Sequence, residues 1–157
     1  QATYTDKPVN GIAAITTSKT FSLMPHRFNF DSVFNADTAT KDVKRNSFRE
    51  IKTVHMPTSQ EWSGFALGNY DLTEVNAVQV GNLFFKDAVD WQFELRRNNA
   101  AGEVIASGVL SPKELRAYQR TRISMTPVSG FSELYLQVKM AAGASGELAL
   151  QDISFEK

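Results

Sequence analysis

The sequence predicts an all-β fold, an antiparallel β-sandwich of two sheets. Apolar and polar residues alternate with a period of two in several short segments, and Gly, Asn, Asp and Pro separate these segments at short intervals. Only one short segment has helical character. The chain has 157 residues, of which 42% are hydrophobic, and this size and composition suit one domain with a single core.

The N-terminal part differs in composition from the rest of the chain. Residues 1–24 are polar and rich in turn residues, and only "TSKTFSL" (17–23) has the character of a strand. We interpret this part as a leader or linker from a preceding segment, with an edge strand of the sandwich as the alternative. The core pattern begins around Phe28, in the predicted strand 26–34, so the sandwich domain is expected to span 25–157.

The segment 91–110 predicts a β-hairpin. Its first strand alternates three apolar with three polar residues, namely Trp91, Phe93 and Leu95 with Gln92, Glu94 and Arg96. "RNNAAGE" then supplies residues that tolerate the left-handed backbone of a tight turn, and "VIASGVL" returns. One face of this hairpin is expected in the core and the other in water.

Four further segments have strand character: 77–85, 120–128, 133–140 and 147–157. In the third of these, Leu134, Leu136 and Val138 share one face, and Tyr135, Gln137 and Lys139 share the other. The segment "SPKELRAY" (111–118) is the one helix candidate, because Ser, Pro and Glu stand where a capping box places them. It predicts one or two turns.

Composition excludes several classes of protein. Lys plus Arg and Asp plus Glu both number 17, so the basic excess typical of a nucleic-acid binder is missing. No apolar run approaches the roughly 18 residues of a membrane span, and the chain has no Cys. The basic stretches 41–52 and 113–122 also contain acids; we interpret them as solvated surface, with anion binding as the alternative. No nucleophile elbow, phosphate loop or zinc-type spacing around His26 and His55 is present, so we expect no enzyme activity. The alternative that the composition leaves open is a pair of glycosidase carboxylates, because acidic residues are plentiful.

Four segments, taken in order, resemble the family 6 carbohydrate-binding modules. They are "FNFDS" (28–32), "EWSGFALGNYDLTEVNAVQV" (61–80), "DWQFELRRNNAAGEVIASGVL" (90–110) and "GFSELYLQVKMAAGASGELALQDISFEK" (130–157). The resemblance covers about 130 residues, roughly the size of one whole domain. It implies a jelly-roll β-sandwich that binds an oligo- or polysaccharide and does no chemistry.

The resemblance also implies a context. The leader is similar to segments that precede such modules in proteins with a sugar dehydrogenase, a cytochrome domain or a trehalose-utilisation-like domain. It therefore implies a targeting module of an exported multidomain enzyme, secreted, periplasmic or on the cell surface, with a neighbouring catalytic domain as partner. The alternative is a structural or interdomain module that has lost sugar binding.

Site residues follow from the resemblance. It places a structural calcium between the first and last strands, at Asp31 and Asp152; carboxylates are suitable calcium ligands. At the loop-side sugar site it places Trp62 at the border, Tyr118 as a stacking aromatic, His55 where another aromatic is expected, and Glu147 where the family has Asn. Some members use the concave sheet face instead. There the row Gln92, Glu94, Arg96, Tyr135, Gln137 and Lys139 would line the cleft, and the alternative reading of this row is an ordinary solvated face.

Overall fold

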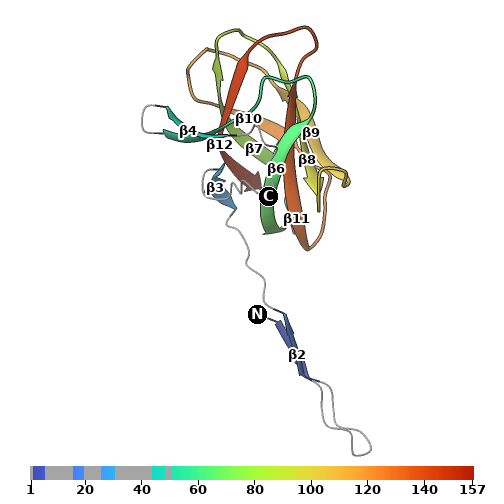
Figure 1. Cartoon of the computed structure of the whole chain (residues 1–157). Coiled ribbons are helices and arrows are strands. Elements are labelled where there is room, and N and C mark those ends of the chain that lie inside the picture. The colour runs from blue at the N-terminus through green and yellow to red at the C-terminus, as the bar shows by residue number, and fades with distance from the viewer. Residues whose placement is uncertain (1, 6–15, 20–25, 31–43, 49–50) are drawn as a thin grey trace, which may run out of the picture.

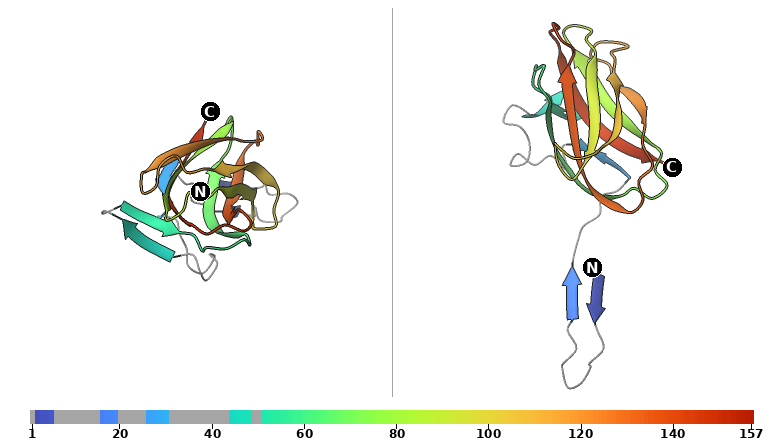
Figure 2. Two further views of the ribbon diagram at one scale, coloured as in Figure 1. Left: turned by 90° about the horizontal axis from the view of Figure 1, so that it is seen from above. Right: turned by 90° about the vertical axis from the view of Figure 1, so that its right-hand side faces the viewer.

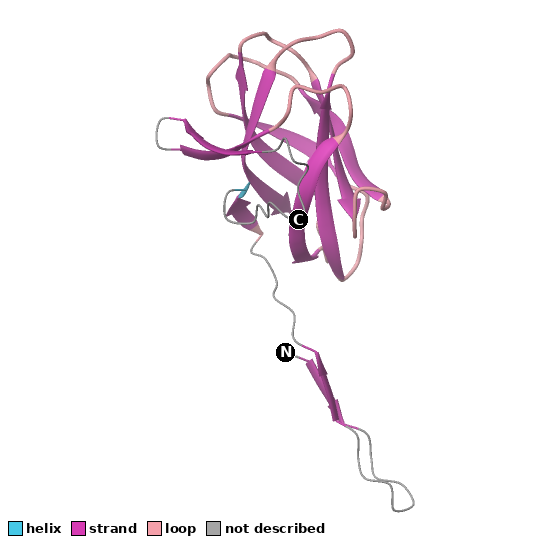
Figure 3. Ribbon diagram, viewed as in Figure 1, coloured by secondary structure: helices cyan, strands magenta, loops and turns pink. Residues whose placement is uncertain are grey.

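The computed structural model describes residues 2–5, 16–19, 26–30, 44–48 and 51–157. Two antiparallel sheets pack face to face, and strands and loops make up nearly all of the described chain (Figures 1 and 3). This confirms the predicted all-β sandwich of two antiparallel sheets. Seen from above, the two sheets enclose a common interior (Figure 2).

The larger sheet has six strands in the order β10-β7-β12-β5-β4, with β3 also paired to β12. β12 has β7 along one side, and β5 followed by β3 along the other. The bounds are β3 Arg27–Asn29, β4 Lys44–Phe48, β5 Ile51–His55, β7 Ala77–Phe85, β10 Gln119–Ser124 and β12 Glu147–Glu156.

The smaller sheet has four strands in the order β6-β11-β8-β9. The bounds are β6 Ser63–Asp71, β8 Trp91–Arg97, β9 Val104–Leu110 and β11 Phe131–Met140. β1 (Ala2–Thr5) and β2 (Thr16–Lys19) form a separate two-stranded sheet. Residues 20–25 lie outside the described residues, so the predicted division between leader and sandwich stays a prediction.

The core lies between the two sheets and follows the period-two pattern. Trp91, Phe93 and Leu95 of β8 are buried in it. Leu134, Leu136 and Val138 of β11 are buried too, at 0% exposure. Each such side chain contributes about 1.5–3 kcal/mol when it leaves water. The alternation therefore fixes which face of the smaller sheet points outward.

The tight turn between β8 and β9 depends on three of its residues: Asn98, Asn99 and Gly102. Asn98 has a φ of 69°, in the left-handed region that Asn tolerates. The Asn99 side chain accepts the amide N–H of Ala101 at 2.9 Å. A Cβ on Gly102 would lie 1.6 Å from the carbonyl oxygen of Arg97, so only glycine fits there. The predicted hairpin is confirmed, with a register shift of one residue between Leu95 and Arg96.

The helix predicted over 111–118 is wrong. Residues 113–117 form bends and a turn, and Arg116 has a φ of 60° that a helix does not allow. The Gln119 side chain closes the loop by donating to the carbonyl oxygen of Ser111 and accepting the N–H of Lys113. The backbone N–H of Arg116 bonds to Phe84 of β7. These hydrogen bonds to Gln119 and Phe84 thus take the place of the helical hydrogen bonds that the capping residues predicted.

Candidate functional site

Six polar residues of β8 and β11 lie together on the outer face of the smaller sheet. The strand register pairs them directly across: Gln92 with Lys139, Glu94 with Gln137, and Arg96 with Tyr135. We call this surface the polar face. Directly opposite residues on one face of an antiparallel pair have Cβ atoms about 5 Å apart, so the two rows predicted separately form one continuous surface.

A hydrogen-bonded network fixes the middle of the polar face. Gln137 donates its amide to Glu94 Oε2 at 2.8 Å, and Arg96 donates Nε to the same oxygen at 2.8 Å. Arg96 Nη2 forms an ion pair with that oxygen at 2.7 Å. Arg96 Nη1 also donates to the carbonyl oxygen of Gly102. The charge of Glu94 is therefore neutralised within the protein. Tyr135 is half-buried, and burial raises the pKa of its hydroxyl.

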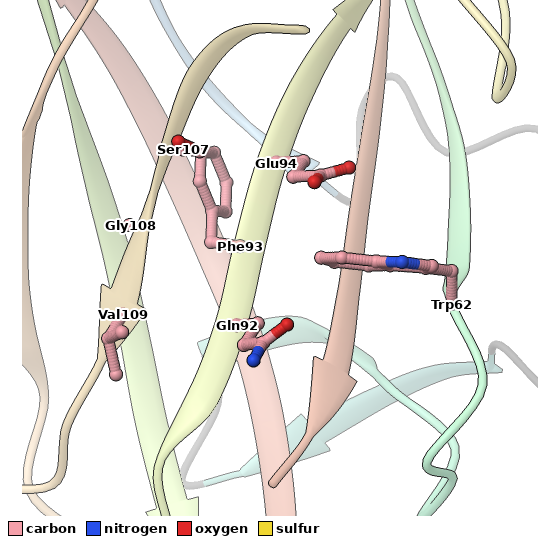
Figure 4. A pocket seen from close by; sticks show the side chains of 7 residues that line it. All are labelled: Trp62, Gln92, Phe93, Glu94, Ser107, Gly108 and Val109. Carbon is pink, nitrogen blue, oxygen red and sulfur yellow. The ribbon is translucent and has the colours of Figure 1, made fainter.

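Trp62 adds an aromatic ring to the polar face. It stands just before β6, and its side chain extends from there over β11 towards β8 (Figure 4). The Lys139 Nζ lies over this ring, 4.7 Å from its centroid. The indole is half-buried, so part of it remains open to solvent.

A hollow of about 230 Å³ lies beside the Trp62 ring. Gln92 and Glu94 line it from β8 (Figure 4), and Ser107, Gly108 and Val109 line it from β9. Gln92, Ser107 and Val109 are exposed. An aromatic ring beside polar side chains can bind a ligand that has both an apolar patch and hydroxyl groups.

Ser107 and Val109 had not been identified from the sequence as lining residues. The register places Ser107 opposite Glu94 and Val109 opposite Gln92. The alternation of "VIASGVL" predicts that Ser107 and Val109 share one face of the strand. The position of the turn then predicts their partners on β8, but only if the one-residue register shift between Leu95 and Arg96 is known.

The residues predicted for the loop-side site do not gather around Trp62. Tyr118 lies by the larger sheet, where its hydroxyl donates to Asp152 Oδ2 at 2.9 Å. His55 stacks on Phe85 with ring centroids 5.6 Å apart. Glu147 forms an ion pair with Lys86. The structure therefore brings Trp62 and Gln92 together and places the other three on β5, β12 and the loop before β10.

His55 and Glu147 are neighbours in this second group. Burial lowers the pKa of His55, and the charge of Glu147 opposes that shift. Burial raises the pKa of Tyr118, and its hydrogen bond to Asp152 adds to this. Whether these residues contact a ligand stays a prediction.

Asp152 is buried, with 2% of its side chain exposed, and both of its oxygens have protein partners. Arg120 Nη2 donates to Oδ1 at 2.6 Å, and Tyr118 donates to Oδ2. Arg120 Nε also donates to the Tyr118 hydroxyl at 2.6 Å. A guanidinium already supplies the positive charge that a carboxylate needs when buried, so the charge of Asp152 is balanced without a metal ion. The other predicted ligand, Asp31, lies outside the described residues, and the calcium site stays a prediction.

Two broader observations concern the described part of the chain. It contains no group of three or more His, Asp or Glu side chains placed to hold a metal ion. It also contains no helix long and apolar enough to cross a membrane.

No protein-family model matches the chain, and no curated protein matches it by sequence. Solved structures do match. A family 6 carbohydrate-binding module from Clostridium cellulolyticum, in complex with xylose, is similar with a TM-score of 0.65 and 17% identity, over 83% of this chain and 96% of that one. A β-1,3-glucan-binding family 6 module from Bacillus halodurans has a TM-score of 0.65 and 10% identity, over 83% and 95%.

A larger enzyme also contains a similar part. The family 43 arabinoxylan arabinofuranohydrolase from Bacillus subtilis, in complex with cellotetraose, has a TM-score of 0.61 and 12% identity. The match covers 94% of this chain and 29% of that enzyme. These likenesses show that this chain has the β-sandwich fold of family 6 carbohydrate-binding modules.

Proposed function

We propose that the chain is a non-catalytic carbohydrate-binding module and that the polar face, with Trp62, is its binding site. The observation that carries this proposal is the position of the Trp62 ring beside a hollow lined by polar side chains. Axial C–H groups give a sugar ring an apolar patch that packs on an aromatic ring, while its hydroxyls need polar partners at the edge.

Free polar groups in the hollow suit that task. The amide of Gln92 and the hydroxyl of Ser107 are exposed, and neither has a side-chain hydrogen bond within the described residues. Glu94 is held rigidly by Arg96 and Gln137. A ligand hydroxyl can therefore bond to Gln92 and Ser107 without breaking a bond of the protein, which lowers the cost of binding.

We further propose that the module serves a larger exported enzyme, at the cell surface, in the periplasm or outside the cell. The match to 29% of the Bacillus subtilis enzyme supports an appended position. A module of weak affinity then raises the concentration of glycan near a catalytic domain.

The test is titration calorimetry of the intact protein and its variants with glycans selected on an array. Trp62→Ala should weaken binding about 5- to 150-fold, because removing a stacking ring costs about 1–3 kcal/mol. Gln92→Ala should weaken it less, since it removes one hydrogen bond worth about 1 kcal/mol. Tyr135→Ala tests how far along the polar face the glycan extends.

Tyr118→Ala is the matched control, because it removes an aromatic residue from the other sheet. Binding that is lost with Tyr118→Ala and retained with Trp62→Ala would move the site to the loop-side residues Tyr118, His55 and Glu147. No binding to a broad panel of plant, algal and bacterial glycans would favour the alternative, a structural module that has lost its sugar site.

A further inference from the structure

The lysine on the polar face has an unusual electrostatic position. Lys139 is half-buried, and its ammonium rests over the Trp62 ring at 4.7 Å. Among the described residues, no carboxylate lies within 4.0 Å of this ammonium. The neighbouring Glu61 is exposed and beyond that distance too.

The rest of the polar face does not balance this charge. Glu94 is the only carboxylate among its six residues, and Arg96 neutralises it through a hydrogen bond and an ion pair. Gln92, Tyr135 and Gln137 are uncharged. The polar face therefore carries one net positive charge, located at the ring on which a sugar is proposed to stack.

The ammonium also covers part of that ring. A sugar that stacks on the covered side must displace Lys139 and break its cation–π contact. A neutral sugar gains the stacking contact with the ring, but it has no charged group that could bind the displaced ammonium. A sugar with a carboxylate or sulfate group offers an ion pair, and the four-carbon stem of lysine lets the ammonium turn towards it.

We propose that Lys139 is a specificity-determining residue and that this site prefers acidic glycans, whose rings carry carboxylate or sulfate groups. This inference rests on the proposed function, since it takes the polar face to be a sugar site. The chemistry it requires is an anionic oxygen group on a sugar ring stacked at Trp62.

The test compares matched ligands by titration calorimetry at low and high salt. The probes are β-1,4-glucan oligosaccharides in three forms: neutral, oxidised to the carboxylate at C6, and sulfated. The same three forms of β-1,3-glucan oligosaccharides serve as a second backbone. An acidic form should bind more tightly than its neutral parent, and added salt should weaken only the acidic form. The two acidic forms separate carboxylate from sulfate recognition.

The decisive variant is Lys139→Met, which keeps an unbranched apolar stem beside the ring. It should weaken binding of the acidic form about fivefold, as expected for a partly exposed ion pair. It should tighten binding of the neutral form, by up to about fivefold, because the cation–π contact no longer competes. The control is Lys157→Met, which removes the same charge from a residue paired with Glu74 and should change neither.

Two results distinguish a failure of the proposed acidic preference from a failure of the proposed sugar site. Neutral forms that bind as tightly as acidic ones, with equal effects of Lys139→Met on both, would overturn the preference and leave the sugar site standing. The absence of binding to all six probes and to the broad glycan panel would overturn the proposed function itself.

Discussion

The buried carboxylate of Asp152 permits a quantitative prediction for Arg120→Ala. The substitution removes the guanidinium that donates to Oδ1 at 2.6 Å and leaves the carboxylate with the Tyr118 hydroxyl at Oδ2. Breaking a buried ion pair costs about 3–5 kcal/mol. Arg120 is 26% exposed, and water entering from its side will solvate part of the charge. We therefore expect a loss of about 2–3 kcal/mol.

This loss is measurable as a shift of the melting temperature. In a domain of this size each kcal/mol corresponds to about 2–4 °C, so Arg120→Ala should melt about 4–12 °C lower. Arg122→Ala is the control, because Arg122 lies two residues along the same strand and pairs with Glu156 in a more exposed position. Its effect should stay below about 1 kcal/mol.

A double variant tests the cause. Adding Asp152→Asn to Arg120→Ala removes the uncompensated charge, so the double variant should be more stable than Arg120→Ala alone. Equal losses in Arg120→Ala and Arg122→Ala, or no recovery in the double variant, would refute the reasoning that a buried charge pair stabilises this sheet.

Three further predictions follow from single residues. Because Arg120 already neutralises Asp152, the melting temperature should be the same in calcium and in chelator; a rise with calcium would support the metal site instead. Burial lowers the pKa of His55 from 6.5, so the folded state prefers neutral His55. The free energy of unfolding should therefore fall as the pH drops through 6.5, because the unfolded chain then binds a proton more readily than the folded protein. Between about pH 7.5 and about pH 5.5, His55→Gln should lose less stability than wild type. Asn82 is 0% exposed, and its side-chain amide has no hydrogen-bond partner in the described residues. Asn82→Leu should therefore raise the free energy of unfolding, measured by denaturant titration, by about 1–2 kcal/mol. A lower free energy of unfolding would instead reveal a hydrogen bond to this amide.

The sequence was most informative where one face of a strand is buried. The alternation in 91–97 and 133–140 predicted both the core residues and the polar face, because a strand exposes every second side chain. The strands β4 and β5 were not predicted. β4 lies within the charged stretch 41–52, whose composition resembles solvated surface, and β5 begins at the end of that stretch. The pairing of β5 with β12, and of β4 with β5, determines their conformation.

The partners of site residues were harder to predict, because they come from distant parts of the chain. Tyr118 was predicted at a loop-side sugar site, but its hydroxyl bonds to Asp152, 34 residues further on. Trp62 was expected at the border of the loops, and the register of β6 with β11 brings it beside Lys139. Such contacts depend on strand order, which no local pattern of residues encodes.

The central position of β12 has a consequence for how the chain matures on the ribosome. This strand follows the other described strands in the sequence, yet β7, β5 and β3 all pair with it. The larger sheet cannot be completed until residue 156 has left the exit tunnel. Until then β3, β5 and β7 lack their partner β12 and have unpaired edges. Unpaired edges invite association with other nascent chains. A pulse of protease during translation should therefore cut this domain in chains whose residue 156 is still inside the ribosome.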